Sequence, residues 1–325
     1  MRNALLVGID HYDWGNGTGR LECCINDAND MAAELEKDYQ GSENFNITTL
    51  TSDQKSVTKA QLFKDIRELF SKEADVALLF FSGHGGDSDL GGYLVTEDSQ
   101  VHDMGVALNE VVELANLATH ITEIIIIVDA CYSGHAGNTD PTQNNIASLR
   151  MGVSILASSK RTQYSVEKNG NGLFTALLLE ALRGGGADVL GDVTVAGIYN
   201  YVDKALGPLQ QRPVFKSHIS ELNTIKKQKP QISEKKLKHL LKLFPDIDDR
   251  YKLTPAHEPT AAPKHLKKEA IFGFLQKCRA NNLIEPIGEE HMYDAAMKKK
   301  YCQLTPVGRL YWKRLKNDKQ KKNGQ

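Results

Sequence analysis

The chain has 325 residues, of which 41% are hydrophobic, and a formal net charge of −1. That length and that apolar fraction are enough for two domains with buried cores, while no apolar run approaches the about 18 residues of a membrane span. The charge is unevenly distributed: residues 1–225 hold 16 Lys+Arg against 30 Asp+Glu, and residues 226–325 hold 24 against 11. Such a split predicts a boundary between two domains.

Five cysteines form no regular framework, and a candidate core strand begins almost at the first residue, which leaves no room for a signal peptide. An odd number of cysteines without a disulfide pattern is typical of a reducing compartment. We therefore expect a cytoplasmic protein.

In chain order, apolar strands alternate with amphipathic helices over the first 220 residues, as a doubly wound α/β fold requires. The predicted strands are 3–9, 46–51, 76–82, 123–129, 152–157 and 213–217. The predicted helices are 26–37, 58–70, 108–118, 173–183 and 194–205. Thr58, followed three residues later by Gln61, predicts a capping box at the start of the second helix.

Two reactive side chains directly follow two of these strands. His84 stands between glycines after the strand 76–82, and Cys131 follows the strand 123–129. The carboxyl ends of parallel strands meet at one rim of a sheet, so we expect the two side chains to lie together as a cysteine–histidine hydrolase dyad. The N–H groups of Gly85 and Cys131 are then candidate oxyanion donors. An isolated cysteine or histidine is more often a core or loop residue, but the paired strand ends and flanking glycines favour the dyad.

The two motifs resemble the caspase and metacaspase peptidases: Ser82-Gly83-His84-Gly85, and Asp129-Ala130-Cys131-Tyr132-Ser133-Gly134 with its cysteine 47 positions after the histidine. The resemblance covers about the first 220 residues. It implies a mostly parallel sheet flanked by helices and a cysteine endopeptidase activity. The second motif departs from the Gln-Ala-Cys-Arg-Gly of true caspases, which indicates the metacaspase-like prokaryotic branch, so cleavage after aspartate is not assumed.

An acidic specificity pocket is predicted beside the dyad. Side chains two positions apart on a strand face the same way, so Asp129 is expected beside Cys131 and Ser82 beside His84. The metacaspase resemblance adds Cys24 and Asp27, at the start of the first crossover helix, to the walls of this S1 pocket. Acidic walls select a substrate Arg or Lys. Alternatively, Asp27 is an ordinary acid at a helix start and Cys24 fills the core.

Two polar segments are candidates for processing or ion binding. The loop 135–150 contains one basic residue, Arg150, which is either a self-cleavage site, as in related peptidases, or part of an uncut surface loop. Because many metacaspases need calcium, the acidic residues after the catalytic histidine are weighed as ligands, but no spaced calcium loop is visible and a solvated acidic loop is favoured. These acids are Asp87, Asp89, Glu97, Asp98 and Asp103.

A basic linker is predicted over 226–232, and a second, small α+β domain over 233–325. Its helix at 269–278, the lysine cluster 298–300 between two strands and the helix at 306–315 resemble a winged helix, with a disordered tail from 316 onward. His291, Cys278 and Cys302 lack zinc-ligand spacing, so no metal is expected.

The basic surplus of this domain predicts an acidic protein partner or nucleic acid. We therefore expect a cysteine endopeptidase regulated through a partner-binding module; the family resemblance alone suggests a role in cell death or defence. Two alternatives stay open: a DNA-binding regulator whose peptidase domain releases the basic module, and a catalytically silent adaptor.

Overall fold

The computed structural model describes residues 1–12, 20–88, 91–100, 103–132, 149–158, 170–206, 213–219 and 223–323; at 87–88, 131–132 and 319–323 it describes the backbone alone. The chain divides into two compact units, Met1–Lys229 and Pro230–Gln325. Within the described part, no helix is long and apolar enough to cross a membrane.

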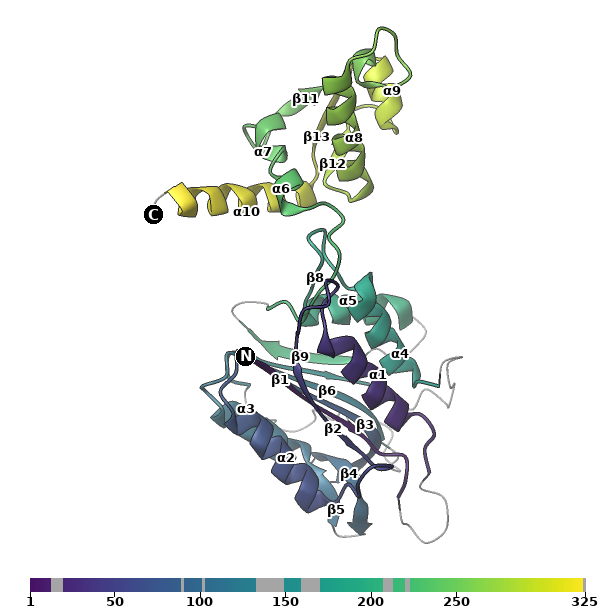
Figure 1. Cartoon of the computed structure of the whole chain (residues 1–325), viewed down its shortest axis with the longest axis vertical. Helices are drawn as coiled ribbons and strands as arrows, with labels where there is room; N and C mark the ends of the chain where they lie inside the picture. Colours follow the sequence, from purple (N-terminus) through teal and green to yellow (C-terminus); the bar gives the residue numbers. More distant parts are fainter. Residues whose placement is uncertain are drawn as a thin grey trace. The chain divides into compact units, whose positions relative to one another are not determined.

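The first unit is an α/β domain built around one sheet (Figure 1). Its strands are β1 (Arg2–Gly8), β2 (Asn46–Thr51), β3 (Val76–Ser88), β4 (Gly91–Gln100), β5 (Asp103–Ala107), β6 (Glu123–Tyr132), β7 (Val153–Ala157), β8 (Asp192–Val193), β9 (Val214–His218) and β10 (Lys226–Lys227). Its helices are α1 (Cys24–Glu36), α2 (Lys59–Ser71), α3 (Leu108–Leu117), α4 (Leu173–Glu180), the π-helical turn η1 (Ala181–Gly185) and α5 (Val195–Leu206).

The strand order β2-β1-β3-β6-β7-β9 is parallel except for β9, which pairs antiparallel with β7. β4 continues the sheet antiparallel to the distal half of β3, and β5 pairs with β4. β8 and β10 form a separate two-stranded ribbon. The mostly parallel sheet flanked by helices predicted from the sequence is confirmed.

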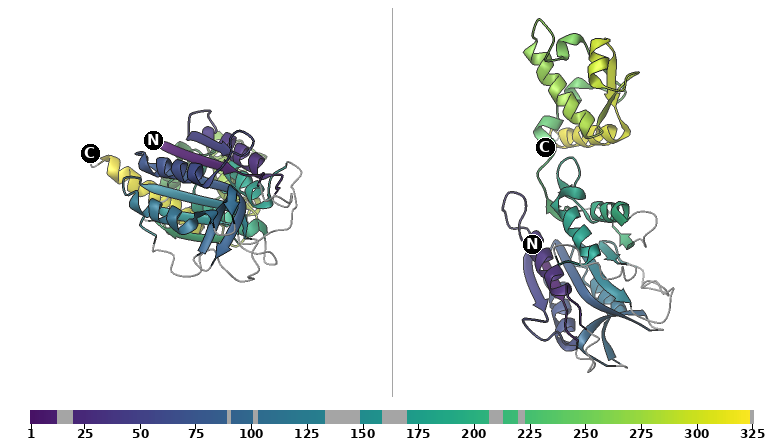
Figure 2. Two further views of the ribbon diagram at one scale, coloured as in Figure 1. Left: turned by 90° about the horizontal axis from the view of Figure 1, so that it is seen from below. Right: turned by 90° about the vertical axis from the view of Figure 1, so that its right-hand side faces the viewer.

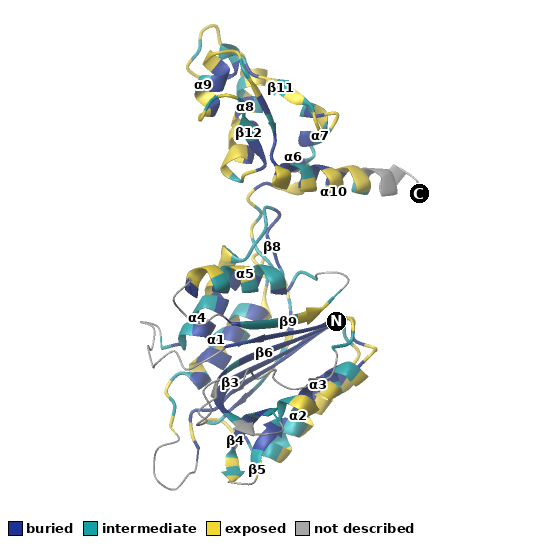
Figure 3. Cartoon of the chain, turned by 180° about the vertical axis from the view of Figure 1, so that it is seen from behind, coloured by how far each residue is buried: buried dark blue, intermediate teal, exposed yellow. Residues whose placement is uncertain are grey.

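Alternate residues of the central strands bury against two different helix layers. Leu79 and Phe81 face the core beneath α2 and α3, whereas Leu78 and Phe80 face the core beneath α1, α4 and α5. Both layers can be followed in Figures 1 and 2, and the dark blue strands of Figure 3 lie between helices whose outer faces are yellow. Burial on both faces explains why β3 and β6 read as continuous apolar runs.

The predicted elements of this unit recur with their ends shifted by a few residues, but three details differ. β3 does not end at Ser82; it continues through the glycines to Ser88 because β4 supplies a pairing partner. The hairpin β4–β5 was not predicted. Of the capping box, only one half forms: the Thr58 hydroxyl accepts from the Gln61 N–H, at 3.2 Å, while the Gln61 side chain bonds Asp65.

The basic stretch predicted as a linker belongs in part to the first unit. Lys226 lies in β10 and is buried, and its ammonium pairs with the Glu34 carboxylate on α1. Lys227 pairs with Asp192 at 2.6 Å. Removing one member of a buried ion pair typically costs about 3–5 kcal/mol, so the Lys226–Glu34 pair holds the strand in place. The exposed linker expected from 226 is therefore corrected: the first unit extends through Lys229.

The second unit is a small α+β domain. Its elements are α6 (Glu234–Leu237), α7 (Leu240–Leu243), β11 (Arg250–Lys252), the 3-10 turn η2 (Pro255–His257), α8 (Leu266–Ala280), β12 (Ile284–Pro286), α9 (Met292–Met297), β13 (Tyr301–Leu304) and α10 (Pro306–Asn323). The strands form an antiparallel sheet in the order β11-β13-β12. The tail predicted to be disordered from 316 instead continues α10 to Asn323. The packed first half of α10, with Trp312 and Leu315 buried, supplies a nucleus from which the helix-forming lysines and glutamine can extend.

Candidate active site

His84 and Cys131 lie opposite each other on the two central strands. β3 and β6 run parallel in a register that pairs Ser82 with Asp129 and His84 with Cys131. Neighbouring strands are about 4.8 Å apart, so the backbones of the two predicted dyad residues are adjacent. The His84 side chain is buried, and Gly85 pairs with Tyr132, one position further along. The sequence-predicted dyad therefore sits at one place on the sheet.

His84 is held by a residue that the sequence reasoning missed. The His84 backbone N–H donates to the hydroxyl of Tyr12, at 2.8 Å, and the two rings lie 4.6 Å apart at an angle of 58°. Tyr12 belongs to the loop after β1, and no motif marked it as part of a site.

Asp27 is enclosed by three hydrogen-bond donors from two other segments, β3 and the residues directly before α4. Its Oδ2 accepts from the Ser82 hydroxyl at 2.8 Å. Its Oδ1 accepts from the Asn171 amide at 3.2 Å and from the Gly172 N–H at 3.0 Å. The side chain is 1% exposed. Two of the predicted pocket residues, Asp27 and Ser82, are thus in direct contact.

Asp129 lies close to the same point. Its Oδ2 accepts from the Thr175 hydroxyl at 2.7 Å. A Cβ built on Gly172 would lie 3.3 Å from Oδ2 of Asp129 and 3.4 Å from Oδ2 of Asp27. The two carboxylates therefore flank the α-carbon of Gly172, where any side chain would press on both.

Crowding two acids into a buried site disfavours their charged forms. Burial and the neighbouring charge of Asp129 raise the pKa of Asp27 to about 7, although the bonds from Ser82, Gly172 and Asn171 oppose the shift. Burial also raises the pKa of Asp129, against the bonds from Thr175 and Ser158. A bound cation would relieve this repulsion.

Cys24 begins α1 and is buried beside Asp27. Its backbone N–H donates to Oδ1 of Asp10, at 2.8 Å. A hydrogen bond with Cys23 and burial raise the pKa of the Cys24 thiol well above its usual value. The ligand atoms of Cys23, Cys24 and Asp27 lie within 4.8 Å of one another, but soft metals bind the thiolate, which this environment disfavours.

Asn171, Gly172 and Thr175 are further contributors that the sequence reasoning missed. They lie at the start of α4, 40 or more positions after Cys131. The one sequence feature that could have pointed to them is Gly172 directly before the helix, but glycine precedes many helices and does not by itself indicate a site.

The Arg150 side chain is engaged by the C-terminal end of α3. Its guanidinium donates to the carbonyls of Ala115, Ala118 and Ile121 at 2.8–3.0 Å. Self-cleavage after Arg150 stays a prediction, and it would require these bonds to break. The adjoining loop, 135–148, lies outside the described residues.

The acidic residues weighed as calcium ligands are engaged by protein donors where they are described. Glu97 accepts from Ser56 and Val57, Asp98 accepts from the Lys59 N–H, and Asp103 pairs with the Lys59 ammonium. The Asp87 side chain and Asp89 lie outside the described residues.

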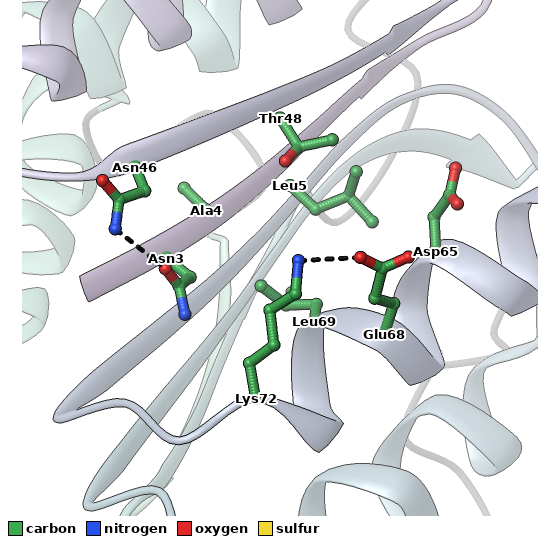
Figure 4. A pocket seen from close by; sticks show the side chains of 9 residues that line it. All are labelled: Asn3, Ala4, Leu5, Asn46, Thr48, Asp65, Glu68, Leu69 and Lys72. Atoms are coloured by element: carbon green, nitrogen blue, oxygen red, sulfur yellow. Dashed lines mark hydrogen bonds and ion pairs between the residues drawn. The ribbon is translucent and has the colours of Figure 1, made fainter. Parts of the chain in front are cut away.

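A pocket on β1, β2 and α2 lies away from the dyad (Figure 4). Its lining includes Asn3, which pairs with Ala77 in the β1–β3 register, seven positions before His84. At about 3.3 Å per residue, this is roughly 23 Å along the strand. We therefore do not assign the substrate to it.

Comparison with known proteins identifies the fold. A family model of the caspase domain, Peptidase C14, matches residues 1–242. The chain belongs to the caspase-domain family of cysteine peptidases. The matched range contains the paired residues His84 and Cys131. Because peptidases of this family act on proteins, a protein substrate is expected.

Two solved structures share the fold. A protein from Geobacter sulfurreducens superposes with a TM-score of 0.51 and 20% identity, over 70% of this chain and 97% of that chain. Caspase-1 from Spodoptera frugiperda superposes with a TM-score of 0.50 and 15% identity, over 70% of this chain and 90% of that chain. A search of the curated proteins finds no significant match.

Proposed function

We propose that this caspase-family peptidase is of the metacaspase-like type and cleaves protein substrates after basic residues, with Arg preferred to Lys. The observation that supports this most is the pair of carboxylates, Asp27 and Asp129, which converge on Gly172. The Ser82–Asp129 pair lies two register positions before the His84–Cys131 pair, a separation of about 7 Å along the strands. A guanidinium can engage two carboxylates at once, which an ammonium does less well.

In this proposal, His84 removes the thiol proton of Cys131, and the thiolate attacks the carbonyl carbon of the scissile peptide bond. The N–H groups of Gly85 and Cys131 stabilise the oxyanion that forms. The imidazolium of His84 then protonates the departing amine, and the C–N bond breaks to leave an acyl-enzyme. Water, deprotonated by His84, hydrolyses the thioester and restores the thiol.

The proposed specificity is tested with four peptides that differ only in the residue before the scissile bond, which is Arg, Lys, Asp or Ala. We expect kcat/KM to follow the order Arg, Lys, Ala, Asp, because an acidic side chain is repelled by the two carboxylates. A preference for Asp would contradict the pocket assignment and the metacaspase-like type together. Adding and then chelating calcium in the same assay shows whether activity depends on calcium.

The raised pKa of Asp27 predicts a pH dependence of this selectivity. We expect the ratio of kcat/KM for the Arg peptide to that for the Ala peptide to rise as the pH increases through about 7, because protonated Asp27 carries no charge to pair with the substrate. Titration of the dyad changes kcat/KM for both peptides equally, so its effect cancels in the ratio. Asp27→Asn, the matched control, should show a lower and flat ratio. A flat ratio in the wild type between about pH 6 and about pH 8 would refute the prediction.

We further propose that the second unit binds an acidic partner. Residues 230–325 hold 21 Lys+Arg against 11 Asp+Glu. Some of this charge is used internally, since Lys298 and Lys300 both pair with Glu289. Lys267 and Lys268, at the start of α8, are exposed. The strand order β11-β13-β12, with α8 directly before β12, is compatible with a winged helix, a fold that binds DNA in some proteins and protein in others.

Binding is tested on the full-length chain with Cys131→Ala, using a labelled DNA duplex and poly-glutamate as probes. We expect at least one probe to bind at low salt and to dissociate as salt increases. Replacing both Lys267 and Lys268 by Glu should weaken binding about tenfold, whereas Lys64→Glu, an exposed lysine of α2, should not. Binding of DNA alone would favour the alternative, a regulator released by self-cleavage, for which Arg150 is the candidate site. If neither probe binds, the basic surplus serves only solubility.

A further inference from the structure

Tyr12 is buried between the end of β1 and the catalytic histidine. Its hydroxyl accepts the His84 backbone N–H, at 2.8 Å, and its ring lies against the imidazole, with centroids 4.6 Å apart. The side chain is 8% exposed and that of His84 is 7% exposed, so little water reaches this contact. A hydrogen bond in such a site fixes its partners more firmly than one in water.

Gly83 makes this contact possible. A Cβ on Gly83 would lie 2.6 Å from the Tyr12 hydroxyl oxygen and 3.0 Å from the Phe81 ring. The first distance is shorter than real Cβ contacts, the second is tighter than most, and the Phe81 ring is itself fully buried in the core. The glycine before the histidine thus has a specific role: it leaves room for the Tyr12 hydroxyl.

The same short loop also organises the opposite wall of the site. Asp10, two residues before Tyr12, is buried, and its carboxylate accepts the Cys24 N–H at the start of α1. α1 carries Asp27 one turn later. Residues 10–12 are therefore bonded both to the helix that presents the acidic pocket and to the strand that presents the histidine.

We infer that Tyr12 is a positioning residue for His84: its hydroxyl and ring fix the strand and the imidazole in the orientation in which His84 exchanges a proton with Cys131. The inference rests on the proposed dyad. It does not depend on the specificity of the pocket. Tyr12 acts through His84 and carries no proton of the reaction itself.

The test is the substitution Tyr12→Phe in the full-length chain, which keeps the ring and removes the acceptor. We expect kcat for the peptide that the wild type cleaves fastest to fall by about tenfold to a hundredfold with KM within about twofold, a part of the roughly 10²–10⁴-fold that a positioned acid–base group provides. Tyr201→Phe is the matched control: it removes a tyrosine hydroxyl that bonds Glu180 on the surface, and activity should stay at the wild-type level. Gly83→Ala should reproduce the loss of kcat.

A second readout separates positioning from a purely structural effect. The rate of iodoacetamide alkylation of Cys131, followed by mass spectrometry of the peptide that contains it, is measured against pH. An imidazole beside the thiol promotes thiolate formation, so we expect the pH of half-maximal rate to shift upward in His84→Ala and, by about half as much, in Tyr12→Phe.

The outcomes distinguish the two claims. If His84→Ala leaves the alkylation profile unchanged, the proposed dyad is wrong. If His84→Ala shifts the profile and Tyr12→Phe changes neither the profile nor kcat, the dyad stands and the role of Tyr12 is refuted. A Tyr12→Phe chain that only unfolds at lower temperature, with wild-type kcat, likewise refutes it.

Discussion

Cys131→Ala and His84→Ala should each lower kcat/KM for peptide cleavage by roughly 10⁴-fold or more, because the two residues of a dyad act as one unit. In the proposed mechanism, the thiolate forms the covalent intermediate, and the imidazole both generates the thiolate and protonates the leaving amine. The paired register of β3 and β6 gives this expectation its structural basis, since it brings the two backbones together.

The control is a cysteine substitution in the other unit. Cys278 is buried in α8, and burial with the nearby Cys302 raises the pKa of its thiol to about 12, so it is a poor nucleophile. Cys278→Ala should retain full activity. Thermal unfolding of the Cys131 variant should match the wild type, and fragments that accumulate only in the wild type would report self-processing. Substantial cleavage by a well-folded Cys131→Ala chain would refute the mechanism.

The second large effect concerns Asp129. Asp129→Ala should lower kcat/KM for the Arg peptide by about 30-fold or more, taking about 2 kcal/mol as the loss of one well-paired charge contact and about 1.4 kcal/mol per tenfold. Its removal leaves Asp27 as the remaining acid of the pair and leaves the Thr175 hydroxyl without its acceptor. The measurement is kcat/KM for matched Arg, Ala and Asp peptides.

Cleavage of the Ala peptide should change much less, because its side chain does not reach the carboxylates. Asp103→Ala provides a matched control, since it also removes a carboxylate with a partner, Lys59, but on β5. Cleavage after Asp should not be restored, as Asp27 still repels an acidic side chain. An equal loss on the Arg and Ala peptides would show that Asp129 supports the fold or the dyad and not specificity.

The sheet and the pairing of His84 with Cys131 across it could be predicted from the sequence because their causes are local. Strands buried on both faces must be continuously apolar, and parallel strands end at one rim of the sheet. The apolar runs before His84 and Cys131 were therefore enough to predict two parallel strands that carry these residues at the same rim. The proximity of Asp27 to Ser82 was expected from the family resemblance, which places both residues in one pocket. The two side chains are joined by a hydrogen bond.

The parts that could not be predicted depend on partners distant in the chain. Lys226 reads as a solvated charge until Glu34, 192 positions earlier, is seen to neutralise it. The hairpin β4–β5 mixes polar and apolar residues, and it is stabilised by the pairing of β4 with the end of β3. Tyr12 carries no motif, and its role follows only from the space that Gly83 leaves beside it.

Cys131 is proposed as the nucleophile of a peptidase selective for basic residues, and one labelling measurement tests both the nucleophile and the selectivity. The wild-type chain is incubated with two peptidyl chloromethyl ketones that are identical except for a terminal Arg or Asp, and the adduct is located by mass spectrometry. We predict that the Arg reagent labels Cys131 much faster than the Asp reagent, with chloride displaced by the thiolate, and that His84→Ala slows the labelling. Faster labelling by the Asp reagent, or an adduct on another cysteine, would contradict the claim.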